Sequence, residues 1–75
     1  MKKEIPISDI YFAAFASLHE IPPKLVKQKG HILFIFVSDQ KFHEIYQAYF
    51  GNHLVPVSAF VSELKRLKSA MYLTK

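Results

Sequence analysis

The stretch that decides the fold is DIYFAAFASL, residues 9–18, which is apolar along almost its whole length. Ser8 or Asp9 can cap a helix that begins here, and the alanines at its centre favour helical structure. Its main apolar face follows helical spacing and comprises Ile7, Tyr11, Ala14, Phe15 and Leu18. Phe12 and Ala16 extend this face on its flank, so the helix is apolar nearly all round. We therefore expect a core helix that is buried on more than one side.

A secretion signal or a membrane anchor is the alternative interpretation of the same stretch. Lys2 and Lys3 could form the basic region of a signal peptide, and Ala-Phe-Ala at 14–16 fits a cleavage site. However, acidic and proline residues between positions 4 and 9 interrupt the passage into the apolar segment. No apolar run reaches the roughly 18 residues that a membrane-spanning helix needs. We expect a cytoplasmic chain that is not cleaved and does not bind a membrane.

The composition fits one small domain with a dense apolar core. The chain has 75 residues, of which 51% are hydrophobic, and it has no cysteine for a disulfide or a thiolate ligand. The net charge is +4, but Lys2, Lys3 and Lys75 lie near the ends, so residues 4–74 carry seven basic and six acidic side chains. Such a nearly neutral body is not a surface built to hold a polyanion. We expect a single domain over residues 1–75, with frayed ends at 1–7 and 73–75.

A β-hairpin is expected after the first helix, because Ile-Pro-Pro at 21–23 forces an extended break. Two strand-like runs follow, KLVKQ (24–28) and HILFIFV (31–37). Lys-Gly at 29–30 suits a two-residue turn, since glycine adopts a positive φ without cost. This turn predicts a register in which Gln28 faces His31.

The second strand of the hairpin has the character of a central strand, because it is apolar on both faces. The first strand protects only one of its edges, so the other edge needs a cover. Leu54–Val57 or Lys3–Ile7 could pair with that edge, or two copies of the chain could meet there. Both segments of the same chain are short and contain proline, so self-association is favoured. The candidate self-association edge comprises Ile32, Leu33, Phe34, Ile35, Phe36 and Val37.

Two amphipathic helices complete the expected fold. Ser38-Asp39 caps the first of them and Gly51-Asn52 ends it; its inner face comprises Phe42, Ile45, Tyr46, Tyr49 and Phe50. The second begins between Pro56 and Ser58, and its inner stripe comprises Phe60, Leu64, Leu67 and Met71. The order is α-β-β-α-α. The predicted class is α+β, with a small antiparallel hairpin sheet packed against helices.

These features together resemble a family of small bacterial α+β domains of unknown function. The resemblance rests on the aromatic-alanine start of the first helix at Tyr11–Phe15 and on the aromatic pair Phe34-x-Phe36 at the end of the hairpin. It also rests on the aromatic helix that ends at Gly51 and on Leu67-Lys68-Ser69 with Tyr72 in the last helix. It implies the fold and a bacterial cytoplasmic setting. It implies no activity, because none is established for the family.

Neither a metal site nor a catalytic site is expected. The four histidines lack a second ligand at the spacing typical of zinc sites; they are His19, His31, His43 and His53. The sequence has no nucleophile elbow, glycine-rich loop or paired carboxylates. We therefore expect no enzyme, no cofactor, no metal and no catalytic residue.

A protein-interaction or self-associating module is the expected function, because so small and apolar a chain leaves surplus hydrophobic surface. Its partner would be another protein or a second copy of the chain, as in a homodimer. The alternative is a nucleic-acid-binding module, in which basic residues of the hairpin and the last helix contact phosphates. The candidate contacts are Lys24, Lys27, Lys29, Lys65 and Arg66.

Overall fold

The computed structural model describes residues 3–51 and 54–74 and confirms the α+β class. In chain order the elements are β1 (Glu4–Ile7), α1 (Ile10–Leu18), β2 (Lys24–Gln28), β3 (His31–Val37), α2 (Gln40–Phe50) and α3 (Val57–Leu73). The three strands form an antiparallel sheet in the order β1-β3-β2. The hairpin and all three helices are thus confirmed, and the sheet has one strand more than the sequence analysis expected.

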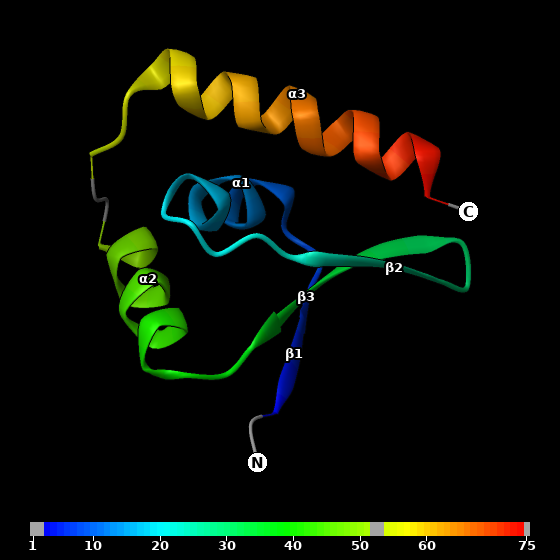
Figure 1. Cartoon of the computed structure of the whole chain (residues 1–75), viewed down its shortest axis with the longest axis horizontal. Coiled ribbons are helices and arrows are strands. Elements are labelled where there is room, and N and C mark those ends of the chain that lie inside the picture. The colour runs from blue at the N-terminus through cyan, green and yellow to red at the C-terminus, as the bar shows by residue number, and fades with distance from the viewer. Residues whose placement is uncertain (1–2, 52–53, 75) are drawn as a thin grey trace.

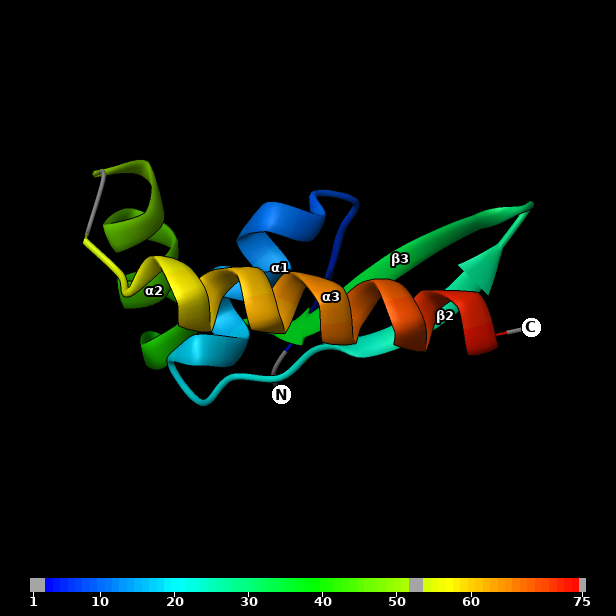
Figure 2. The same ribbon diagram turned by 90° about the horizontal axis from the view of Figure 1, so that it is seen from above.

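Helix α1 occupies the centre of the molecule, between the sheet and α3, while α2 lies at the end of β3 (Figure 1). Figure 2 shows the long helix α3 crossing over α1. Covered on more than one side, α1 buries five consecutive residues, Phe12 to Ala16. Asp9 caps it as predicted, because its Oδ1 accepts a hydrogen bond of 2.9 Å from the Tyr11 amide. The prediction that Tyr11 lies on the buried face of this helix is wrong, since its side chain is 54% exposed.

The β2–β3 hairpin has the predicted turn and register. Gln28 pairs with His31, and Lys29 and Gly30 have φ angles of 52° and 82°. Two consecutive residues with positive φ make the type I′ turn that matches the twist of a two-residue hairpin. Local turn chemistry therefore determines this part of the fold.

Strand β1 corrects two expectations from the sequence. Residues 4–7 are not frayed: they pair with Phe34 to Val37, so most of the edge assigned to self-association is covered by the same chain. The Ser38 amide donates to the Lys3 carbonyl over 2.7 Å, and hydrogen-bonded pairs alternate along an antiparallel ladder. Pro6, paired with Ile35, is therefore in a non-hydrogen-bonded position, where its missing N–H costs the ladder nothing.

The sheet is covered by helices on one face. Phe34 and Phe36 point into this interface and are 0% and 2% exposed, together with Phe12, Phe42 and Leu67 in the core. The alternate residues of the strands point the other way, and no helix of the described ranges 3–51 and 54–74 packs on them (Figure 1). We call this second surface the open face; it carries Glu4, Pro6, Lys24, Val26, Leu33, Ile35 and Val37.

The helix ends follow the predicted capping with one unexpected residue. Asp39 Oδ1 accepts a hydrogen bond of 2.8 Å from the Phe42 amide, and Gly51 ends α2. Helix α1 ends in a Schellman motif, because the Ile21 amide donates to the Ala16 carbonyl over 3.0 Å. Glu20 holds the left-handed position of this motif with a φ of 66°, where glycine is the usual residue.

The C-terminal helix also extends further than expected. Helix α3 continues through Leu73, and the Thr74 amide and hydroxyl both donate to the Ala70 carbonyl. Fraying from residue 73 is therefore wrong for Leu73 and Thr74. The predicted stripe of Phe60, Leu64, Leu67 and Met71 packs on the core as expected.

Candidate functional site

The inner stripe of α2 is only partly covered by the rest of the chain. Phe42 and Ile45, in the first half of the helix, are buried. Tyr46 and Phe50 continue the same stripe but are 41% and 67% exposed. Helical spacing normally places such residues in a core. Beside the half-buried Tyr49, Tyr46 and Phe50 therefore present aromatic surface that the described residues cover only in part.

This surface lines a groove between β1 and α2, which we call the aromatic groove. Two adjoining hollows of about 260 and 250 Å³ share Ile7 and Tyr46 as lining residues. The strand supplies one wall and the helix the other, with the start of α1 between them. The lining residues are Ile5, Pro6, Ile7, Ser8, Asp9, Phe12, Phe42, His43, Tyr46 and Phe50.

Buried aromatic rings support the floor of the aromatic groove. Phe12 meets Tyr46 and Phe42 edge to face, with ring centroids 5.6 and 5.8 Å apart. Tyr46 in turn lies against Phe50, with centroids 4.8 Å apart. Edge-to-face aromatic pairs add about 0.5–1.5 kcal/mol each beyond area burial. The groove therefore has a preformed apolar wall in the free chain.

Polar groups stand at both ends of the aromatic groove. At one end the Tyr49 hydroxyl donates to Asp9 Oδ2 over 3.1 Å. Burial, followed by the hydrogen bond to Asp9, raises the pKa of Tyr49 above its ordinary value of 10.0. At the other end His43 Nε2 lies 3.1 Å from Ser38 Oγ. These groups can orient a bound chain while the apolar wall supplies contact area.

The Ser38–His43 contact has the residue types of a nucleophile and its base, but it lacks the remaining parts of such a site. Activation requires a third group that orients the imidazole. Within residues 3–51 and 54–74 no carboxylate bonds to the other ring nitrogen of His43. Ser38 precedes the N-cap of α2 and His43 lies in its first turn, so the contact connects positions i and i+5 across the start of the helix. The pair therefore serves to hold the start of α2.

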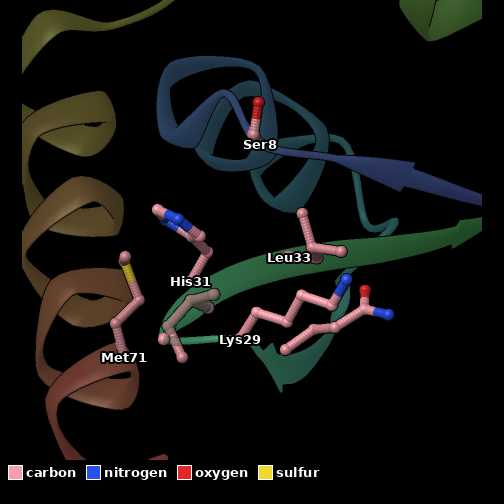
Figure 3. A pocket seen from close by; sticks show the side chains of 8 residues that line it. Ser8, Lys29, His31, Leu33 and Met71 are labelled. Carbon is pink, nitrogen blue, oxygen red and sulfur yellow. The ribbon is translucent and has the colours of Figure 1, made fainter.

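A larger hollow, of about 680 Å³, lies elsewhere, at the tip of the hairpin. Strand β1 ends at Ile7 and the chain turns into α1, so β3 continues beyond its partner for His31 to Leu33. Figure 3 shows Leu33 extending from β3 toward Ser8, and His31 pointing toward Met71 on α3. Of the six residues predicted to form the self-association edge, Ile32 and Leu33 are the two that β1 does not pair with.

The candidate nucleic-acid contacts do not form one surface. Lys24 lies on the open face, whereas Lys27, three residues on, lies on the opposite side of β2. Lys29 is in the turn at the hairpin tip. On α3, Arg66 donates to Glu63 over 2.8 Å, so its charge is already paired, beside the exposed Lys65.

The histidines lie apart from one another. His19 Nδ1 is 2.9 Å from the Phe15 carbonyl, His31 faces the hairpin hollow, and His43 contacts Ser38. His53 lies outside the described residues. In the part of the chain that the structure describes, no three side chains of the metal-binding types converge. None of the described helices combines the length and apolarity needed to cross a bilayer.

Comparison with known proteins supplies a family but no activity. A family described as "Domain of unknown function (DUF5659)" matches residues 2–73, nearly the whole chain. The chain belongs to this family. The resemblance to small domains of unknown function expected from the sequence is thereby confirmed. Neither a curated protein nor a solved structure shows significant similarity to it.

Sequence reasoning placed the groove residues in the core instead of at a site. Tyr46 and Phe50 were assigned to the inner face of α2 because they share its helical spacing. In the same turns Tyr49 packs on Phe12 and Phe15 of α1, so the helical spacing carries no signal that separates the exposed residues from the covered one. Ile5 and Ile7 were missed as groove residues because β1 itself was not expected.

Proposed function

We propose that this DUF5659 domain is a non-enzymatic protein-interaction module that binds a short apolar segment of another protein in the aromatic groove. The observation that carries the proposal is the exposure of Tyr46 and Phe50, at 41% and 67%, beside a preformed apolar hollow. Tyrosine and other aromatic residues are enriched at the centres of protein interfaces and supply large contact areas at small entropic cost.

An extended conformation of the bound segment fits the wall formed by β1. The register directs Glu4 and Pro6 away from β3, so their carbonyl groups face outward along the edge of the sheet. An extended chain that lies in the groove can donate hydrogen bonds to these carbonyls, as in strand addition. Pro6 offers no donor in return, which limits how far such a ladder can extend and prevents indiscriminate pairing.

A peptide selection tests the proposal with the chain as it exists. Random twelve-residue peptides displayed on phage are selected for binding to the domain, and the affinities of the selected peptides for the domain are measured. We expect apolar peptides whose affinity falls at least tenfold with Tyr46→Ser or Phe50→Ser. The matched control is Tyr72→Ser, because Tyr72 is 87% exposed at the far end of α3 (Figure 1).

The control variant should change the affinity less than twofold. Circular dichroism melts of all three variants verify that they remain folded. A selection that yields no specific peptide would contradict the proposal. So would peptides that are equally sensitive to the substitution of Tyr72.

A further inference from the structure

The open face of the sheet is a second apolar surface, on the side away from α1 and α3. Leu33 and Ile35 are partly exposed there, Val37 is 44% exposed, and Val26 adjoins them on β2. These four side chains occupy the middle of the face. None of them belongs to the core cluster, and together they form an apolar strip along β3 and the adjoining part of β2. Helix residues of the described ranges reach only its ends, where Met71 borders the hollow beside Leu33 and Lys41 borders the one beside Val37.

The charges on the open face are of opposite sign on its two outer strands. Glu4 on β1 is paired with Val37, and Lys24 on β2 is paired with Ile35. All four residues line one hollow of about 420 Å³ on this face. Neither Glu4 nor Lys24 makes an ion pair within the described part of the chain. Glu20, Asp39 and Lys41, which lie outside the strands, also line this hollow. On the strands themselves, an acidic residue of β1 and a basic residue of β2 flank the apolar centre.

We propose that two copies of the chain associate through this open face, sheet against sheet, about a two-fold axis parallel to β3. Such an axis places β1 of one copy over β2 of the other and stacks the apolar strips of the two β3 strands. Glu4 of each copy then lies just beyond the start of the partner's β2, about 7 Å from Lys24 along the strand direction, given a rise of about 3.4 Å per residue. An extended lysine side chain spans that offset, so the symmetry creates two equivalent Glu4–Lys24 contacts.

The size of the face predicts a weak, concentration-dependent dimer. Strand β3 has seven residues, so the face is about 24 Å long; three strands make it about 14 Å wide. The resulting area is well below the roughly 800 Å² per partner of a standard interface. The two charge contacts would select the orientation of the copies more than they would strengthen the dimer.

Charge reversal on both rims provides the test. The dimer dissociation constants of the wild type, Glu4→Lys, Lys24→Glu and the double variant are measured by sedimentation equilibrium from micromolar to millimolar concentration. We expect each single variant to weaken the dimer at least tenfold, because like charges then face each other. The double variant restores opposite charges and should return to within about threefold of the wild type.

Lys65→Glu is the matched control, because it reverses an exposed cation on α3 and should leave the constant within about threefold of the wild type. A wild type that stays monomeric at millimolar concentration would overturn the proposal, as would a double variant no tighter than the single ones. Neither result would affect the proposed function, because the side chains of Glu4 and Lys24 do not line the aromatic groove and Glu4→Lys keeps the backbone carbonyl that the bound segment would use.

Discussion

The hydroxyl of Tyr49 donates a hydrogen bond of 3.1 Å to Oδ2 of Asp9, and forty positions of the chain separate these two residues. The other carboxylate oxygen of Asp9 caps α1 through the Tyr11 amide. One carboxylate therefore joins the start of the central helix to the end of α2. It also defines one end of the aromatic groove, since Asp9 lines that groove.

A double-mutant cycle on this pair measures the connection. We expect Asp9→Ala to cost more than Tyr49→Phe, because it also removes an N-cap worth about 1 kcal/mol. The coupling energy between the two substitutions should be about 0.5–1.5 kcal/mol, the range of a single hydrogen bond. Urea unfolding of the four proteins gives the cycle, and strictly additive effects would show that the hydrogen bond contributes nothing.

The raised pKa of Tyr49 predicts a specific alkaline behaviour. Its folded-state pKa lies above the ordinary value of 10.0, so the folded state holds this proton more tightly than the unfolded state. The stability contribution is fully present below pH 10 and is lost as the pH rises through the folded-state pKa. We expect the stability advantage of the wild type over Tyr49→Phe to shrink as urea unfolding is repeated between pH 8 and 11. A gap that is constant or grows with pH would contradict the direction of the shift.

The left-handed Glu20 predicts a stabilising substitution. Glycine adopts a φ of 66° without the steric cost that a glutamate pays. Glu20→Gly should therefore raise the free energy of unfolding by about 0.5–1 kcal/mol. Glu44→Gly removes the same side chain from an exposed helical position of α2 and should lower it by about 1 kcal/mol. Thermal melts that show both variants destabilised alike would refute this assignment.

The pairing of β1 predicts a pattern of amide protection in β3. The register directs the backbone amides of Phe34 and Phe36 toward β1. We expect both to exchange slowly with solvent deuterium, at a rate that does not change when the protein is diluted. If dilution accelerated their exchange, the edge would be covered by a second copy of the chain, and the observed β1 pairing would be wrong.

The parts of the fold that were predictable are those specified by neighbouring residues. The register of the hairpin follows from Lys29-Gly30, and the start of α2 follows from Asp39, because turns and caps depend on local chemistry. Strand β1 is different. Its four residues include Pro6 and carry a weak strand signal, and its partner lies about thirty positions away. It was one of three possible covers for the β3 edge. Like Leu54–Val57, it was less favoured than self-association because it is short and contains proline.

The candidate site shows the same limit. Periodicity correctly placed Tyr46 and Phe50 on the same stripe as Phe42 and Ile45. It could not say how far along the helix the stripe is covered, because that depends on the length of α1 and on where β1 ends. An amphipathic pattern predicts which residues share a face; the tertiary arrangement decides which of them are left for a partner.

The most direct test of the central claim is a nuclear Overhauser measurement on the domain bound to a peptide selected for affinity. We expect intermolecular contacts from the peptide side chains to the rings of Tyr46 and Phe50 and to the side chains of Ile5 and Ile7, which form the two walls of the aromatic groove. Contacts confined to the open face, to Val26 and Ile35, or to the hairpin tip at Lys29, would contradict it.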